Sequence, residues 1–446
     1  MSFRANDIIS KKAMISPCFS TNKGVNQVAR PAMSRTRNGQ RTITLPITEE
    51  HYAEIIDNPE RFRLEWLDVF YTDCPELFPP GFEKGYEMKG HYHSDRQNIA
   101  IRRIALRDGT KYQIRPAFVM PMMVARTAEV EAGLFLRKFS VPYWAIVRLF
   151  GRNVTFWYRL EISLGRNSIV GTTVKTVPVP KNLLADEKHE KIVREKVYIA
   201  TTVTEGVLLG AEISPTASKD DLLEAYGVFK AEAEEVEPNY APKTVNTDGW
   251  SGTIGAWSAL FMGVTLIRCF LHAWLRIRER AKNLKEQFFE IGKRVWNVYY
   301  SATRTTMSQR LRRLRDWAKE NLAGIVQEKV LDLCAKQSEW SLWYDHEEAH
   351  TTSNMLDRLM RQQDGYFDRG QHFHGDFVSA NLRSRSWAIL HNYWPWGPET
   401  VNENEGARCP AERLNGKRYC DCWLANLLVA ASLGGTKKIP PKIRND

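Results

Sequence analysis

The chain has 446 residues, 43% of them hydrophobic and 26% charged, a composition typical of a globular protein with about two or three domains. It contains no apolar run of about eighteen residues or more, so the sequence predicts no membrane-spanning helix. The net charge of +11 favours an anionic partner such as DNA, and seven cysteines in a chain of this length indicate a reducing compartment rather than a disulfide framework.

Residues 1–41 are polar and rich in Ser, Asn, Arg and Lys. They lack the apolar stretch of a secretory signal, so we expect a flexible basic arm. Residues 42–180 are predicted to form an α+β region that binds DNA. Within it, Asp108-Gly109 favours a tight turn between two strands, Ile99–Ile104 and Tyr112–Ile114.

Helical patterns follow this hairpin. Met120–Lys138 has the periodicity of one amphipathic helix. Residues 139–165 predict two helices separated by Gly151-Arg152-Asn153, which is the arrangement of a helix-turn-helix, and an ordinary helical hairpin is the alternative. In the helix-turn-helix interpretation, Arg152 and Arg159 contact DNA. An extended linker is predicted at Lys175–Lys181.

The next segment, residues 181–271, predicts three strands, a helix, a strand, a helix and a strand. The strands are Leu183–Asp186, Lys196–Val203, Gly206–Ile213, Lys243–Asp248 and Val264–Cys269, and the helices are Ser218–Glu235 and Thr253–Leu260. This is the order of the ribonuclease H-like fold, a mixed α/β sheet in which the first and fourth strands are neighbours. Asp186 and Asp248 each end one of these strands, so we expect them at one edge of the sheet. Two carboxylates in a partly dry site repel each other unless they share a cation.

The segment Leu271–Asn321 is predicted to be helical and is rich in Arg and Lys. Its cations alternate with Trp, Leu, Phe and Tyr, which fits either a solvated surface or an insertion that faces DNA. In the second case, Arg276 and Arg278 are candidates for DNA contact. A further helix is predicted at Asn354–Gln363, and residues 396–446 are expected to form an irregular basic tail.

Three motifs resemble those of a known group of enzymes. Asn246-Thr247-Asp248-Gly249-Trp250, followed by Cys269-Phe270-Leu271-His272, resembles the signature of DDE/D-type bacterial insertion-sequence transposases of the Mutator-like group. Asp186-Glu187-Lys188-His189 resembles the segment around the first catalytic aspartate of that group. Thr352-Ser353-Asn354-Met355-Leu356-Asp357-Arg358 resembles the motif of the third acid, with Asp357 where glutamate is usual. Glu347 and Glu348, in the preceding loop, remain alternatives for this third position.

The resemblance implies a ribonuclease H-like catalytic domain formed by residues 181–271 and 341–395, interrupted by an all-helical insertion at residues 272–340. It also implies cleavage of DNA strands by hydrolysis and their rejoining by transesterification. Two Mg²⁺ ions, for which Mn²⁺ can substitute, would be held by three residues that serve as both catalytic and metal-binding groups: Asp186, Asp248 and Asp357.

For the remaining motif residues the expected roles differ. Cys269 and His272 are two possible metal ligands without a second pair nearby, so a structural role is favoured over zinc binding. Trp250 is expected either to stack on an unpaired base or to fill the core under the sheet edge. Arg358 is a further candidate for DNA contact.

The implied partners are double-stranded DNA, both the terminal inverted repeats of a mobile element and a target, and a second copy of the chain in a homodimer. The implied location is the prokaryotic cytoplasm, in association with the nucleoid. Two alternatives stay open: a domesticated DNA-binding protein without catalysis, and a structure-specific nuclease on the same fold.

Overall fold

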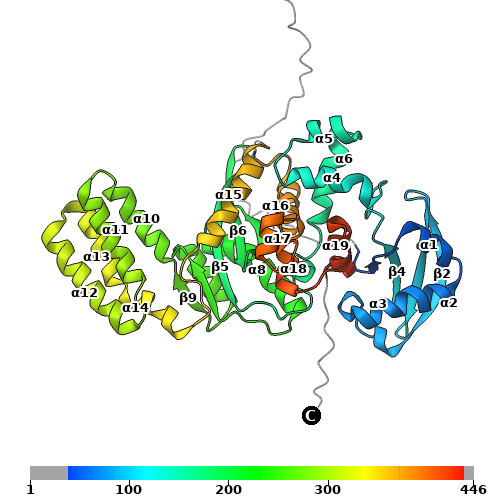
Figure 1. Ribbon diagram of the computed structural model, residues 1–446, viewed down its shortest axis with the longest axis horizontal. Helices are drawn as coiled ribbons and strands as arrows, with labels where there is room; N and C mark the ends of the chain where they lie inside the picture. Colours follow the sequence, from blue (N-terminus) through cyan, green and yellow to red (C-terminus); the bar gives the residue numbers. More distant parts are fainter. Residues whose placement is uncertain (1–38, 371, 436–446) are drawn as a thin grey trace, which may run out of the picture. The chain divides into compact units, whose positions relative to one another are not determined.

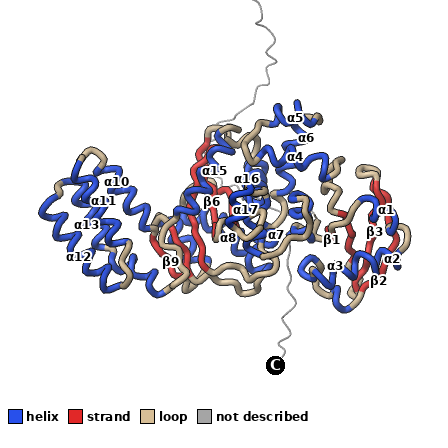
Figure 2. Tube along the Cα trace, viewed as in Figure 1, coloured by secondary structure: helices blue, strands red, loops and turns tan. Residues whose placement is uncertain are grey.

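The computed structural model describes residues 39–370 and 372–435. Apart from its last three residues, the basic arm predicted at residues 1–41 lies outside this part of the chain. The described chain is a mixed α/β structure with two mixed sheets (Figure 1), and Figure 2 shows that helices make up most of the remainder. Among the described helices, none combines the length and the hydrophobicity that crossing a lipid bilayer requires.

The first sheet has the strand order β1-β4-β3-β2. Its strands are β1 (Thr42–Leu45), β2 (Tyr86–Ser94), β3 (Ile99–Leu106) and β4 (Lys111–Pro116). Strands β3 and β4 are antiparallel and joined through Asp108-Gly109, which confirms the predicted hairpin. Gly109 has a φ of 82°, a conformation that glycine adopts without strain. The parallel strand β1 and the outer strand β2 were not predicted.

Short helices cover this sheet. They are α1 (Glu49–Ile55), α2 (Pro59–Phe62), a π-helical turn (Arg63–Leu67) and α3 (Asp68–Asp73). Phe62 and Trp66 are buried and meet edge to face, with their ring centroids 4.9 Å apart. Together with apolar residues of the four strands, they form a core separate from that of the second sheet.

Three helices follow: α4 (Thr127–Arg137), α5 (Tyr143–Phe150) and α6 (Val154–Leu164). The prediction that the first of them begins at Met120 is wrong, because the chain first folds back through a bridge between Val119 and Arg126. The other two helices occupy the segment predicted to hold a helical pair. Asn153 begins α6 by accepting a hydrogen bond from the backbone N–H of Phe156 (2.8 Å).

A short helix, α7 (Ile169–Thr173), leads into the second sheet. The segment predicted as an extended linker, Lys175–Lys181, has no helix or strand. It is nevertheless packed against the body of the protein, because Val179 is fully buried among the apolar residues of the second sheet.

The second sheet has the strand order β7-β6-β5-β8-β9. Its strands are β5 (Asn182–Ile192), β6 (Glu195–Thr204), β7 (Val207–Ser214), β8 (Thr244–Thr247) and β9 (Thr265–Arg268). The first and fourth strands of this segment, β5 and β8, are neighbours as expected; they run parallel, and Leu184 is paired with Asn246. Asp186 and Asp248 each follow this pair by two residues, Asp186 within β5 and Asp248 directly after β8. The prediction that the first strand ends at Asp186 is wrong, since β5 continues to Ile192.

Alternation along β5 assigns its residues to the two faces of the sheet. Leu183 and Ala185 pack with α8 (Lys219–Val236) and α9 (Ser251–Leu260). Leu184 belongs to the core on the opposite face, which includes residues of α15 (Asn354–Asp368) and α16 (Phe377–Tyr393). Asp186 shares the face of Leu184, so its side chain lies on the α15 side.

The segment between β9 and α15 is helical. It contains α10 (Phe270–Ala281), α11 (Glu286–Tyr299), α12 (Arg304–Asn321), α13 (Gly324–Ala335) and α14 (Gln337–Trp340). These helices share a core of their own, in which Phe270, Trp274 and Trp340 are buried. The segment predicted as an all-helical insertion is therefore helical.

The C-terminal segment departs from its prediction. Instead of an irregular tail from residue 396, the chain forms α17 (Pro398–Glu403), α18 (Pro410–Asn415) and α19 (Trp423–Ala430). Leu424 and Leu427 are fully buried in the core that also contains α15 and α16. The apolar helix α19 is therefore a core element.

Candidate metal centre

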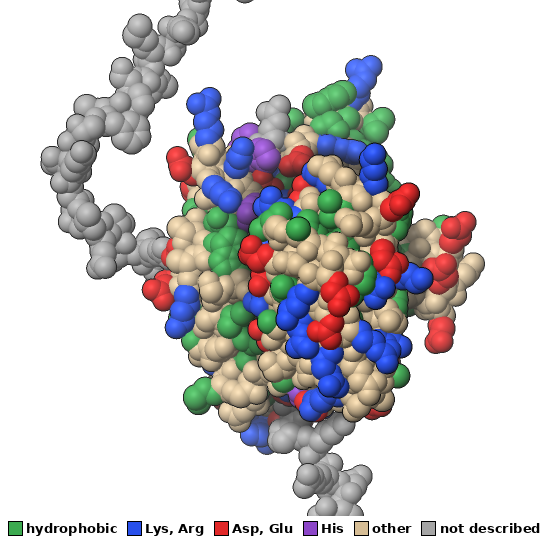
Figure 3. All heavy atoms as spheres, turned by 90° about the vertical axis from the view of Figure 1, so that its left-hand side faces the viewer, with side chains coloured by type: hydrophobic (Ala, Val, Ile, Leu, Met, Phe, Trp, Pro, Cys, Tyr) green, Lys and Arg blue, Asp and Glu red, His purple; other side chains and the backbone are tan. Residues whose placement is uncertain are grey.

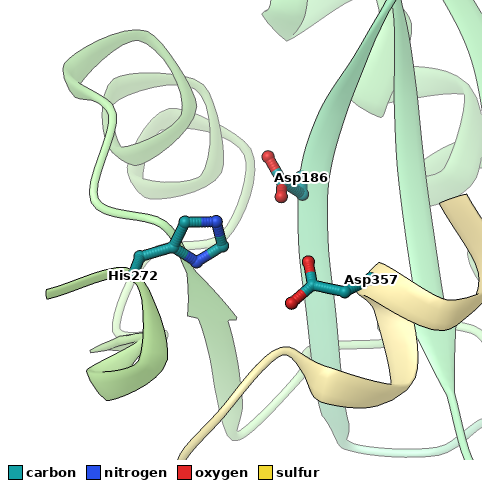
Figure 4. A group of neighbouring side chains, drawn as sticks. All are labelled: Asp186, His272 and Asp357. Atoms are coloured by element: carbon teal, nitrogen blue, oxygen red, sulfur yellow. The ribbon is translucent and has the colours of Figure 1, made fainter. Parts of the chain in front are cut away.

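Three side chains from distant parts of the chain converge on one space beside the second sheet. Asp186 comes from β5, His272 from the first turn of α10 and Asp357 from the first turn of α15. One potential ligand atom of each lies within 4.8 Å of the other two. Figure 4 shows the two carboxylates and the imidazole directed toward one another. Oxygen and nitrogen atoms so arranged are suited to hold a metal ion.

Ser353 joins the two helix starts that carry His272 and Asp357. Its hydroxyl lies 3.2 Å from Cys269 Sγ, 3.4 Å from His272 Nδ1 and 3.3 Å from Asp357 Oδ2. Its backbone N–H donates to Cys269 Sγ (3.2 Å). Ser353 and Cys269 are both buried, so these bonds fix the beginning of α15 against the beginning of α10.

The two residues of the Cys-x-x-His motif therefore have different surroundings. Cys269 contacts the hydroxyl and the backbone N–H of Ser353. His272 also faces the two carboxylates, a position that the sequence analysis did not assign to it. Ser353 was likewise missed, although its place before a predicted helix is a signal for a capping residue.

Asp248 lies beside this group, directly after β8. Its Oδ1 accepts a hydrogen bond from the backbone N–H of Trp250 (2.7 Å), and its backbone carbonyl accepts one from Arg276 (3.3 Å). Gly249 has a φ of 89°, and a Cβ there would lie 2.3 Å from Arg268 Nε. Only glycine fits this turn without displacing its neighbours, so the turn holds the Asp248 backbone in a defined position.

The electrostatics of the group indicate a shortage of positive charge around Asp186. Burial, followed by the charges of Asp248 and Glu187, raises the pKa of Asp186 to about 7. Asp248 is not among the three residues whose ligand atoms lie within 4.8 Å, but it is near enough to exert this effect. A cation at the site would relieve the repulsion between these carboxylates.

His272 is the group's own source of positive charge. Burial lowers its pKa, but the hydrogen bond and charge of Cys269, and then the charges of Asp186 and Asp357, outweigh burial and raise the pKa to about 9. In its neutral form the imidazole is a nitrogen ligand, and in its protonated form it is a counter-charge to the carboxylates.

Glu187 points to the opposite face of β5. Its carboxylate accepts hydrogen bonds from the hydroxyls of Tyr226 (2.6 Å) and Thr253 (2.7 Å), and all three residues are buried. These bonds tie β5 to α8 and α9 on the side away from Asp186. They therefore help to fix the strand that carries the candidate ligand.

The alternatives for the third acid lie elsewhere. Glu347 and Glu348 are exposed, and the carboxylate of Glu348 accepts a hydrogen bond from Asn182 (3.3 Å). Of these three candidates, Asp357 is the one whose carboxylate is grouped with Asp186 among the described residues.

The side-chain atoms that could bind a metal agree with the ligand preferences of the expected ions. Asp186 and Asp357 offer carboxylate oxygens, and Asp248 adds a third carboxylate beside them. Oxygen ligands suit Mg²⁺, which also retains several waters, while an additional imidazole nitrogen is well tolerated by Mn²⁺. The residues present therefore fit a divalent cation of this class.

The residues predicted to contact DNA are distributed over several elements. Arg276 touches the Asp248 backbone, and Arg278 and Arg358 are exposed on α10 and α15. Arg159 is exposed on α6, and Arg152, in the turn before that helix, pairs with a glutamate of α4 (3.3 Å).

Trp250 lies at the surface beside Asp248. Its side chain is 37% exposed, so it does not fill the core under the sheet edge. Its ring meets those of Tyr198 and His189 edge to face, with centroids 6.2 and 6.3 Å away. An exposed aromatic ring in this position is available for stacking.

A second group of potential ligands was not predicted from the sequence. Glu190, Asp368 and His372 also bring ligand atoms within 4.8 Å of one another. Glu190 is already bonded to His372 Nδ1 and lies 3.5 Å from the buried Lys188 ammonium. The Lys188 ammonium offsets the negative charge of Glu190.

Comparisons of the sequence with models of known protein families and with curated proteins find no match.

Proposed function

We propose that this protein is a metal-dependent DNA strand-cleaving and strand-transferring enzyme, a transposase of the DDE/D type. The observation that carries the proposal is the convergence of Asp186 and Asp357 beside the second sheet, with Asp248 directly after the neighbouring strand β8. Partly buried carboxylates gathered in this way repel one another unless they share a cation.

In this proposal, the carboxylates of Asp186, Asp248 and Asp357 would hold the divalent ions. Asp186 is grouped with Asp357, and it is near enough to Asp248 for that charge to raise its pKa. Mg²⁺ or Mn²⁺, when bound in pairs, supplies activation of the attacking hydroxyl or water and stabilisation of the leaving oxygen. His272 balances the negative charge of the carboxylates, and Ser353 holds it in place through its hydroxyl.

The topology of the second sheet supports assigning it to the ribonuclease H-like class. The sheet has the order β7-β6-β5-β8-β9, with two antiparallel and then two parallel neighbours, and its first and fourth strands along the chain, β5 and β8, are adjacent as expected. The helices α10–α14 stand where the insertion of the resembling transposases is expected. Both features support the proposal independently of the acidic residues.

The distribution of cations supports DNA as the substrate. The chain carries 63 Lys and Arg against 52 Asp and Glu. Figure 3 looks onto the side of α11–α13 and shows Lys and Arg side chains gathered over one part of that face, with acidic side chains among them. In this proposal α5 and α6 read the terminal repeats as a helix-turn-helix, with Arg159 toward the groove. A homodimer pairs the two ends of the element, and the enzyme acts in the cytoplasm at the nucleoid.

The experiment is a cleavage and joining assay on supercoiled plasmid carrying the inverted repeats that flank the gene, with Mg²⁺. We expect nicking and joined products from the wild type. Asp186→Asn and Asp248→Asn should abolish both while the protein still binds the ends. Asp220→Asn, at an exposed position of α8, is the matched control and should cleave normally.

Three results would contradict the proposal. Binding without nicking by the wild type would indicate a non-catalytic DNA-binding protein. Cutting without joining would indicate a structure-specific nuclease. Cleavage by Asp186→Asn at the wild-type rate would show that the metal site is wrongly assigned.

A further inference from the structure

A cavity of about 510 Å³ opens next to the candidate metal centre. Asp248 and His272 line one part of it, so the cavity adjoins the site of the proposed chemistry. The remaining walls come from β9 and from α10, α13 and α14. Its volume falls within the range of roughly 300–1,000 Å³ found for small-molecule sites.

One wall of the cavity is apolar and rigid. Leu275, Leu333 and Trp340 contribute to it. The Trp340 indole N–H donates to the carbonyl of Leu333 (2.9 Å), which fixes the orientation of the ring. A flat apolar group entering the cavity would therefore meet a preformed surface.

The rest of the lining is mainly cationic. Five Arg or Lys side chains line the cavity, against three acidic ones. Three of the five already have partners: Arg268 pairs with Glu339, Arg276 donates to the Asp248 carbonyl, and Lys329 pairs with two acidic residues of its own helix.

The other two cations, Arg280 and Lys336, are available to a ligand. Arg280 is exposed, and Lys336 is only partly exposed. In the part of the chain that the structure describes, the Lys336 ammonium has neither a hydrogen bond nor an ion pair. A partly buried ammonium without a partner is suited to bind an anionic group.

We infer that this cavity takes one unpaired nucleotide of the DNA strand next to the cut. Its base lies against the wall of Leu275 and Leu333, and its phosphate lies against Lys336 and Arg280. This inference rests on the proposed function and adds to it the position of an extrahelical nucleotide. Bases within a duplex are stacked and paired, so only a nucleotide turned out of the helix can enter a cavity of this size.

The experiment uses the full chain and a DNA end in which 2-aminopurine replaces one base at a time on either side of the cut, with Ca²⁺ in place of Mg²⁺. An unstacked 2-aminopurine fluoresces more strongly than a stacked one. We expect a several-fold rise in emission at one position with the wild type. The double variant Lys336→Ala/Arg280→Ala should lose that rise.

The matched control is Arg312→Ala/Arg313→Ala, which removes two exposed cations of α12 that do not line the cavity. It should retain the rise even where general DNA affinity weakens. The inference would be overturned if the Lys336→Ala/Arg280→Ala variant retained the rise in emission. It would also be overturned if the wild type gave no rise in emission at any substituted position. A parallel reaction with Mg²⁺ distinguishes these results from failure of the proposed function. The proposed function predicts that the wild type cleaves DNA whether or not a base is turned out.

Discussion

Asp186→Asn is expected to make the metal-free protein more stable while removing its response to divalent ions. The wild-type carboxylate is enclosed and lies near Asp248 and Glu187, which together with burial raise its pKa from 3.8 to about 7. The folded state therefore disfavours the ionised form. Asparagine is nearly the same size and carries no charge, so the substitution removes this cost without opening a cavity.

The pKa of Asp186 sets the size and pH range of the effect. Below about pH 4 the carboxyl is protonated in both folded and unfolded chains, and the substitution should change little. Between about pH 4 and pH 7 the unfolded chain loses the proton while the folded chain retains it, so wild-type stability falls. A rise of the pKa from 3.8 to about 7 corresponds to at most about 4 kcal/mol. Because the side chain keeps some exposure to solvent, we expect a gain of about 1–3 kcal/mol above pH 7.

The assay is urea unfolding of both proteins at pH 4 and pH 8, with and without Mn²⁺. Without metal at pH 8, the Asp186→Asn variant should be the more stable protein. With Mn²⁺ the wild type should become the more stable protein, because only the wild type is stabilised by the free energy of metal binding. Asp220→Asn should follow the wild type in all conditions. A variant that is less stable than the wild type without metal, or that gains as much from Mn²⁺, would refute the reasoning.

Other predictions concern the rest of the fold. Burial, and then the charge of a nearby lysine, lowers the pKa of His391 from 6.5 to about 4. The free energy of unfolding should therefore fall by about 2–3 kcal/mol as pH drops from 6.5 to 4. His391→Gln should flatten this part of the stability–pH profile in urea titrations. Arg385→Met should destabilise the protein by about 3–5 kcal/mol in the same assay, because it leaves the buried carboxylates of Glu212 and Glu232 without their guanidinium partner. A decrease in the free energy of unfolding of less than about 1 kcal/mol would argue against this ion network. Arg159→Ala should weaken protection of the terminal repeats in footprinting, and an unchanged footprint would mean that the proposed recognition helix is misplaced.

Part of the fold could be predicted because its residues follow simple periodicities. The strands and helices of the second sheet alternate in a recognisable order, and β5 and β8 are neighbours as expected. The extension of β5 beyond Asp186 was missed because residues 187–191 are mostly charged. Those charges are compensated by contacts that the sequence does not reveal, such as the contact of Lys188 with Asp364 of α15.

The candidate metal centre was also predicted only in part. Asp186 lies on β5 and Asp248 directly follows the neighbouring strand β8, so their proximity follows from the strand order. The position of His272 beside the carboxylates depends on how α10 begins against α15, which is set by the tertiary contacts of Ser353. No local pattern in the sequence encodes those contacts, so the cavity beyond them could not be predicted either.

The most direct test of the central claim is an anomalous diffraction map of crystals loaded with Mn²⁺. The proposed site predicts manganese bound between the carboxylates of Asp186 and Asp357, with Asp248 among its neighbours, and loss of that peak in Asp186→Asn crystals. Manganese bound only elsewhere, for example at Glu190, Asp368 and His372, would contradict the claim that these three aspartates form a metal centre.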